Sequence, residues 1–185
     1  MLDDIQTEAK DQMERAIEAL KKQLASIRTG RANAALLDSV RVSYYGSMTP
    51  LNQVANVGVA DARLLVVKPW EKGILKDVEK AIVEANLGLT PSNDGEIVRV
   101  PIPALSEERR REYVKQTKSK GEDAKVAVRN ARRDANEMLK SAMKDGEISE
   151  DDEKRGLKHV QDLTDAYVKK VDELLAHKEQ EIMEV

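Results

Sequence analysis

Apolar residues recur every three or four positions over residues 4–29, which is the spacing of one face of an α-helix. Asp3 or Asp4 is placed to cap the start of this helix, and Gly30 to end it in a left-handed conformation. The positions expected to face a core are Ile5, Ala9, Met13, Ala16, Ile17, Leu20, Leu24 and Ile27. The pattern therefore predicts a long amphipathic helix that needs partners along its whole length.

The pattern changes between residues 31 and 104, where β-branched residues gather in short runs bounded by Gly, Asp or Pro. Such runs are typical of strands, and SNDG at 92–95 is typical of a turn. The predicted strands are 39–45, 54–59, 63–68 and 96–102, and a helix with Gly88 as its stop is predicted over 73–87. This segment is expected to form a compact module of mixed helix and strand.

Helical spacing returns over residues 106–144 and again over about 149–183. Each helix starts with a serine followed by acidic residues, so Ser106 and Ser149 are the expected caps. The first of these helices has a seam of small and apolar residues: Gly121, Ala124, Val128, Ala131, Ala135, Met138 and Ala142. Small residues at a seam permit close contact between helices, so the seam predicts tight packing against a neighbour.

The three long helices predict an antiparallel three-helix bundle made of residues 1–30 and 105–185. The module, residues 31–104, is inserted where the first helix turns into the second. The fold class is therefore α+β: a long bundle with an inserted small α/β domain rich in strands. A hinge is expected where the chain crosses between the two, near 28–31 and 104–106, at Thr29, Gly30, Leu105 and Ser106.

Composition removes several classes of function. The 185 residues include no cysteine, which excludes disulfides, zinc–thiolate sites and thiol nucleophiles. His159 and His177 lie five helical turns apart, about 27 Å, and share no metal. No phosphate-binding glycine loop, dinucleotide fingerprint or serine nucleophile elbow occurs. We expect no catalytic residues, no cofactor and no metal. The acidic start without an apolar signal core predicts a cytoplasmic protein with no membrane span.

Charge is sorted along the chain. Residues 106–145 carry 12 basic and 8 acidic side chains, whereas residues 146–185 carry 6 basic and 12 acidic ones. On a helical wheel the basic residues of the first segment fill an arc from about 100° to 200° away from the seam. This basic arc comprises Arg111, Lys115, Lys118, Lys125, Arg129, Arg132, Arg133 and Lys140.

A solvated helix face usually mixes charges of both signs, because like charges three or four residues apart repel each other. A line of arginine and lysine instead fits a phosphate backbone. One tryptophan, four tyrosines and no phenylalanine argue against stacking on single strands, so a folded RNA fits better. An acidic protein remains the alternative partner. Arg28 and Arg31 either complement a helix C-terminus or face the partner.

Five segments resemble the ribosome recycling factor family, and their order covers the full chain. They are SIRTGRA (26–32), LLDSVRVSYYGS (36–47), IVRVPIPALSEERR (97–110), VAVRNARRDAN (126–136) and KDGEISEDDEKR (144–155). Two positions depart from the family pattern: Ala34, near which a proline is usual, and Ala131, where a larger aliphatic residue is usual.

The resemblance implies an L-shaped, monomeric protein that binds the post-termination ribosome. With elongation factor G and GTP it would separate the subunits and release mRNA and tRNA, the GTPase being the partner. Arg132 matches the family's critical arginine. The residues expected to contact 23S rRNA are Arg132, Arg129, Arg133, Arg28, Arg31, Arg111, Lys118 and Lys125. An enzyme with a concealed site, or an adaptor for acidic proteins, would be the competing interpretations.

Overall fold

A computed structural model describes residues 1–184, which divide into two compact units. Unit 1 comprises residues 1–27 and 111–181. Unit 2 comprises residues 28–110, and the end of the chain from Ile182 groups with it. Among the described helices, none is long and apolar enough to cross a membrane.

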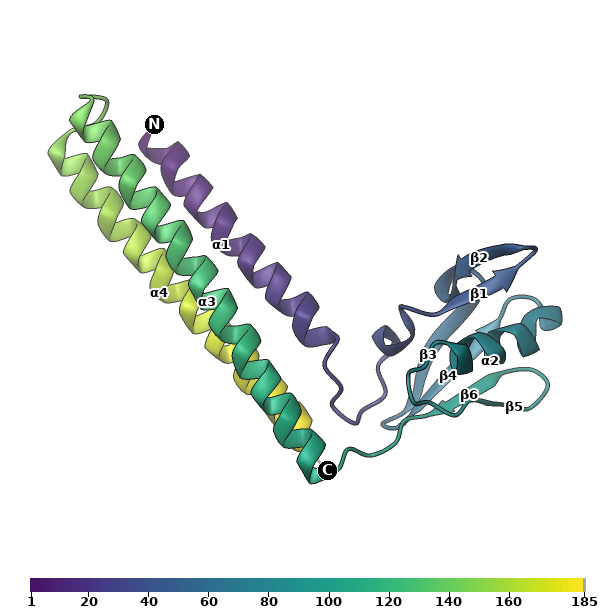
Figure 1. The fold of residues 1–185 in the computed structure, drawn as a ribbon. Helices are drawn as coiled ribbons and strands as arrows, with labels where there is room; N and C mark the ends of the chain where they lie inside the picture. Colours follow the sequence, from purple (N-terminus) through teal and green to yellow (C-terminus); the bar gives the residue numbers. More distant parts are fainter. Residues whose placement is uncertain (185) are drawn as a thin grey trace. The chain divides into compact units, whose positions relative to one another are not determined.

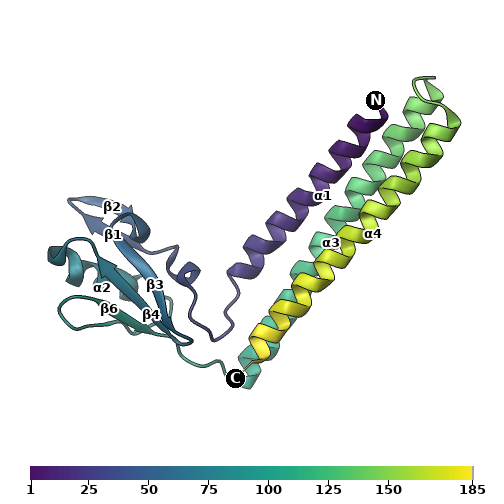
Figure 2. The same ribbon diagram turned by 180° about the vertical axis from the view of Figure 1, so that it is seen from behind.

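Unit 1 is built from three long helices: α1 (Leu2–Ala25), α3 (Glu107–Lys144) and α4 (Glu150–Met183). They lie side by side, with α1 and α4 running in one direction and α3 in the other (Figures 1 and 2). One end of the shared core joins Ile5 and Ala9 of α1 to Leu139 of α3 and Val160 of α4. The predicted antiparallel three-helix bundle is therefore confirmed.

The ends of α1 differ from the prediction. Met1 is the N-cap and makes no side-chain capping bond, while Asp3 and Asp4 lie inside the first turn, where the helix dipole still favours them. The helix ends at Ala25, before the predicted end at 29, and the Ser26 hydroxyl donates at 2.7 Å to the Gln23 carbonyl oxygen in its last turn. Gly30 does adopt a left-handed φ of +77°. However, it lies beyond the end of α1 and does not terminate it.

The starts of α3 and α4 are capped as predicted. The Ser106 hydroxyl oxygen accepts a hydrogen bond from the Arg109 N–H at 3.2 Å. At α4 the pairing is reciprocal: Asp152 N–H donates to Ser149 Oγ at 3.1 Å, and Ser149 N–H donates to Asp152 Oδ2 at 3.5 Å. These bonds satisfy backbone donors that the first turn of a helix leaves unpaired.

The seam of α3 was predicted correctly except at one step. Met138 is 44% exposed, and its neighbour Leu139 is fully buried in its place. The reason lies on α4, where Gly156 faces Leu139. A Cβ atom on Gly156 would come within 2.7 Å of the Leu139 Cδ2 atom. The missing side chain at Gly156 leaves room for a leucine that the wheel of α3 alone placed off the seam.

Unit 2 packs α2 (Leu75–Glu84) against antiparallel strands (Figure 1). The four-stranded sheet has the order β3-β4-β6-β5, and a separate hairpin pairs β1 with β2. The strands are β1 (Arg41–Tyr44), β2 (Ser47–Pro50), β3 (Ala55–Asp61), β4 (Leu64–Pro69), β5 (Ser92–Asn93) and β6 (Val98–Pro101). Short 3₁₀ turns occur at Ala34–Leu37, Leu51–Gln53 and Lys72–Ile74. The core contains Val42, Leu65, Val78, Ile82 and Val98.

Several parts of unit 2 depart from the sequence pattern, and one of them is β2, which was not among the predicted strands. The predicted turn at 92–95 begins with a short strand, since Ser92 and Asn93 pair with β6. The predicted helix over 73–87 ends sooner, at Glu84, because Asn86 takes a left-handed φ of +58° two residues before Gly88. Asparagine tolerates this conformation better than other residues with a side chain, so it serves as the stop.

Candidate nucleic-acid interface

The basic arc of α3 lies on unit 1, and its members are not equivalent. Arg129 and Arg133 are exposed, and so are Lys115, Lys118 and Lys140. Arg132 is only half-exposed, because it sits where α3 meets α4. The arc is therefore an exposed surface in which two members, Arg132 and Lys125, are partly buried.

The groove is an open cavity of about 400 Å³ between α3 and α4. Its floor and walls include Thr164 and Val168 of α4. Both helices supply its charged and polar side chains: Arg129, Arg132, Gln161, Asp165, Lys169 and Asp172. The cations come mainly from α3 and the carboxylates from α4, as the sorting of charge along the sequence indicated.

Arg132 is held in this groove by a neutral side chain. Its Nη1 donates to Gln161 Oε1 at 3.4 Å. The Gln161 Nε2 in turn donates to Asp165 Oδ1 at 2.9 Å, one turn further along α4. The Nε of Arg132 is enclosed by protein and has no hydrogen-bond partner. One edge of the guanidinium therefore faces α4, while the residue as a whole keeps part of its surface in solvent.

Lys125 has a different environment on the same arc. Its Nζ lies 2.7 Å from Asp172 Oδ1 of α4 and 3.9 Å from Glu122 Oε1, and its side chain is only 17% exposed. A carboxylate at that distance largely neutralises the cation. Lys125 is therefore less available to an external phosphate than its place on the helical wheel implies.

Three other predicted RNA contacts lie elsewhere. Arg28 and Arg31 belong to unit 2. Arg28 donates through Nη2 to the Leu87 carbonyl oxygen, and Arg31 is ion-paired with Glu184. Arg111 is exposed near the start of α3, about 30 Å along the helix from Arg132 at 1.5 Å per residue. The structure thus brings Arg129, Arg132 and Arg133 together and does not add these three to the group.

The predicted hinge residues are close to one another. A Cβ atom on Gly30 would lie 3.6 Å from the Leu105 Cγ atom. Thr29 Oγ1 accepts a long hydrogen bond of 3.4 Å from the Arg31 N–H, and Ser106 caps α3. The outgoing and returning segments of the chain therefore run past each other at Gly30 and Leu105.

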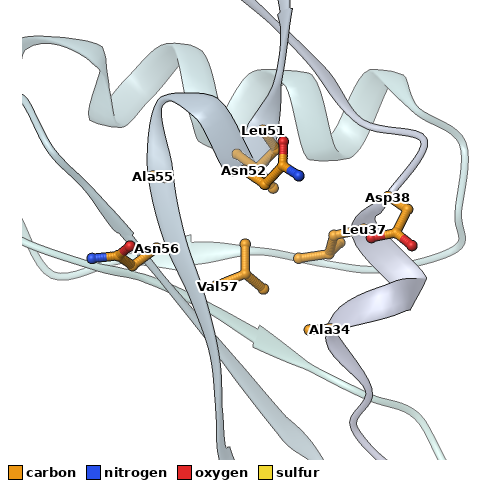
Figure 3. A pocket seen from close by; sticks show the side chains of 8 residues that line it. All are labelled: Ala34, Leu37, Asp38, Leu51, Asn52, Ala55, Asn56 and Val57. Carbon is orange, nitrogen blue, oxygen red and sulfur yellow. The ribbon is translucent and has the colours of Figure 1, made fainter.

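Unit 2 has a cavity of about 240 Å³ between the 3₁₀ turn at Ala34–Leu37 and the segment 51–57. Leu37 and Val57 extend into it, as Figure 3 shows. Its polar lining residues are Asp38, Asn52 and Asn56. One carboxylate and two amides do not make an acid–base pair or an activated nucleophile. Among the described residues, no group of three His, Cys, Asp or Glu side chains could hold a metal ion.

Gln161 and Asp165 were absent from the predicted site. The usable signal was that α3 and α4 are antiparallel and joined by a short connection, so Arg132 must face a residue near position 161. Aligning the two seams would have found the pair. A wheel of α3 by itself contains no information about the neighbouring helix.

Comparisons with known proteins agree with the resemblance noted in the sequence. A family model described as ribosome recycling factor matches residues 20–183. The chain is 59% identical over 182 residues to the ribosome-recycling factor of Ralstonia pickettii, covering 98% of each chain. It is 57% identical over 185 residues to that of Azoarcus sp., covering 100% of each.

Two solved structures are similar over the whole chain. One is a solution structure of the ribosome recycling factor, with a TM-score of 0.77 and 41% identity, covering 100% of this chain and 98% of the other. The second describes the T. thermophilus ribosome recycling factor and the E. coli elongation factor G bound to the E. coli post-termination complex. It has a TM-score of 0.68 and 43% identity, and covers 100% of both chains.

Proposed function

The chain belongs to the ribosome recycling factor family, and on that premise we propose that it recycles ribosomes after translation termination. It binds the post-termination ribosome through large-subunit rRNA. With elongation factor G and GTP it promotes separation of the subunits and release of mRNA and tRNA. The chain itself is not an enzyme in this proposal, since GTP hydrolysis belongs to elongation factor G, and it acts in the cytoplasm.

The observation that carries the proposal is the position of Arg132 in the α3–α4 groove, between the exposed Arg129 and Arg133. A guanidinium presents several N–H donors in a fixed plane, which suits a phosphate or the edge of a base. Two exposed arginines beside it add sequence-independent attraction to an RNA backbone. Lys118 and Arg111 extend the same helix and are proposed as further RNA contacts. Lys125, Arg28 and Arg31 remain predicted contacts that would first have to leave partners within the protein.

Co-sedimentation with purified large ribosomal subunits over a series of salt concentrations tests this function. Arg132→Ala is expected to weaken binding and to lower the slope of log affinity against log salt by about 1, the value for one lost phosphate contact. The free energy of unfolding should change by no more than about 1 kcal/mol, because part of the side chain is solvent-exposed. Arg15→Ala, at an exposed position on α1, is the matched control and should leave binding unchanged.

Arg132→Lys tests whether RNA binding needs the planar shape of the guanidinium or only its positive charge. Lysine keeps the positive charge but lacks the planar group, so we expect partial recovery of binding and incomplete subunit splitting. Full splitting activity with lysine would show that charge alone is required. Association of the unaltered protein with acidic proteins, and none with large subunits, would replace the proposed function by that of an adaptor.

We further propose that Thr29, Gly30, Leu105 and Ser106 form a hinge. It joins the bundle, which stays bound to rRNA, to the inserted module, which moves during subunit splitting. Two observations support a hinge there. The chain passes from one unit to the other at 27–28 and 110–111, close to these residues. Gly30 also has a backbone conformation that side chains disfavour.

A further inference from the structure

We propose that Gln161 and Asp165 of α4 are positioning residues, which hold the Arg132 guanidinium ready for RNA without neutralising its charge. The inference rests on the proposed function and deepens it, because it assigns part of the RNA site to a second helix. Neither residue needs to touch RNA. They act through Arg132.

The Arg132 guanidinium keeps its positive charge in the groove, because its bonding partner is neutral. Within the described part of the chain, the only side chain that bonds to the Arg132 guanidinium is the neutral amide of Gln161. Two carboxylates of α4, Asp165 and Asp172, line the same groove, and Asp172 pairs with Lys125 at 2.7 Å instead. An arginine bound to a carboxylate would have to exchange one anion for another on binding RNA. An arginine bound to an amide keeps its full charge for a phosphate.

The orientation of the Gln161 amide is fixed by both of its bonding partners. The amide of Gln161 must present its oxygen to Arg132, because its nitrogen carries only donors and would face the donors of the guanidinium. Asp165 fixes this choice, since its carboxylate accepts the Gln161 Nε2–H at 2.9 Å. Asp165 therefore orients the Gln161 amide, and the amide oxygen in turn orients the Arg132 guanidinium.

The groove also limits the freedom of the Arg132 side chain before RNA binds. The Nε is enclosed by protein, and Nη1 reaches toward α4. A long arginine side chain otherwise samples many rotamers, and ordering it on binding costs free energy. Enclosing one edge in the groove removes most of that freedom beforehand. The bond to Gln161 is long at 3.4 Å, so it guides the group without competing strongly with a phosphate.

Gln161→Ala tests the positioning role directly. Affinity for purified large subunits at fixed salt is expected to fall about three- to tenfold, the range for one modest hydrogen bond. The melting temperature should stay within error, because Gln161 is exposed. The matched control is Gln12→Ala, where Gln12 Nε2 donates to Glu8 Oε1 at 3.0 Å on α1, a different helix from the basic arc. Equal affinity of the Gln161 and Gln12 variants would overturn the inference.

Two substitutions at Asp165 separate its charge from its role as an acceptor. Asp165→Asn and Asp165→Ala remove the same negative charge from the groove, so they change the long-range attraction to RNA equally. Only asparagine keeps an oxygen that accepts from Gln161. The alanine variant is therefore expected to bind large subunits about threefold more weakly than the asparagine variant. Identical affinities would show that Asp165 does not act through Gln161.

A double-mutant cycle completes the test. In an Arg132→Lys background no planar group remains to be oriented, so Gln161→Ala should have little further effect on binding. An undiminished effect would mean that Gln161 touches RNA itself or supports the bundle, and would overturn a role through Arg132. Failure of the unaltered protein to bind large subunits would instead contradict the proposed function, so the two failures are distinguishable.

Discussion

Lys178 is a cation at a core position of the bundle. It is 8% exposed and follows Val171 at the spacing of the buried face of α4. Burial lowers the pKa of its ammonium group, and Glu181, whose Oε2 lies 3.7 Å from the Lys178 Nζ, acts against that shift. A charged group held this far from water contributes less stability than a well-packed apolar side chain would.

Lys178→Met is expected to raise the free energy of unfolding by about 1 kcal/mol, because methionine fills similar volume without desolvating a charge. Denaturation by urea measures it, and Lys154→Met, at an exposed site on the same helix, is the control. A loss of stability would mean that the Lys178 ammonium makes a contact the bundle needs.

Individual residues show where sequence reasoning stops. Lys178 has the spacing of the buried face of α4, but its charge conceals it from a pattern of apolar positions. Arg132 was placed on an open surface because the wheel of α3 ignores α4. Both residues are amphipathic, because each carries its charge at the end of a long apolar stem that can be buried. A pattern of apolar and polar letters does not record that division.

At the scale of elements, two glycines allow close packing of helices. A Cβ atom on Gly121 of α3 would come within 2.2 Å of Leu175 Cδ1 on α4. A Cβ atom on Gly156 of α4 would meet Leu139 at 2.7 Å and Leu2 of α1 at 3.0 Å. Gly156 therefore lies where all three helices approach one another.

Gly156→Ala is expected to destabilise the protein by about 1–2 kcal/mol. Alanine favours a helix by about 1 kcal/mol over glycine, but the added methyl group strikes Leu139, which is fully buried and would have to shift within the core. Gly73→Ala is the control, because nothing lies within 4 Å of its added Cβ and its φ is not left-handed. Thermal unfolding compares them. A more stable Gly156 variant would show that Leu139 repacks at little cost.

A second element-scale prediction concerns Tyr167 of α4, which is 3% exposed. Burial, followed by a hydrogen bond to Glu14 and the charges of Glu14 and Asp11 on α1, raises the pKa of its hydroxyl to about 12. An unfolded tyrosine ionises near pH 10. The resulting stability is complete below about pH 10 and is lost as the pH rises towards about 12, since the unfolded chain then gives up its proton first.

Chemical denaturation at about pH 9 and about pH 11 checks this dependence. Tyr167→Phe should lose less stability between the two values than the unaltered protein, because it has no hydroxyl to ionise at this site. The other tyrosines are present in both proteins and cancel. An equal loss in both would show that α1 and α4 are not coupled through this hydroxyl.

The sequence predicts the long helices, but it does not predict where they end or where the short strands form. A strong helical period in the sequence predicts α1, α3 and α4, because each of these helices buries one face along its whole length. The apolar spacing continues to the buried Ile27 although α1 ends at Ala25, so the period does not fix the end of this helix. β2 and β5 lie at sheet edges, and β5 has only two residues. Pairing with a neighbour creates such strands, so their own composition carries little signal.

At the scale of the whole molecule, the proposed hinge predicts motion between the units during subunit splitting. The sequence contains no cysteine, so Lys10→Cys on α1 and Lys76→Cys on α2, both at exposed positions, allow a fluorescent donor and acceptor to be attached. On large subunits, addition of elongation factor G and GTP should change energy transfer between them. Unchanged transfer during productive splitting would show that the two units work as one rigid body.

The insertion of unit 2 into unit 1 also has a consequence for how the protein is made. The ribosome synthesises α1 first, yet Ile5 packs against Val160, which is added 155 residues later. At roughly 5–20 residues per second, α1 waits on the order of ten seconds with its apolar face uncovered. Residues 28–110 of unit 2 are a continuous segment that contains its core, so this segment is able to fold during that interval. A folded insert brings its two ends close together, which shortens the flexible loop that α1 must close to find α3. Folding of the module during synthesis therefore brings α1 closer to α3 and helps the bundle to assemble.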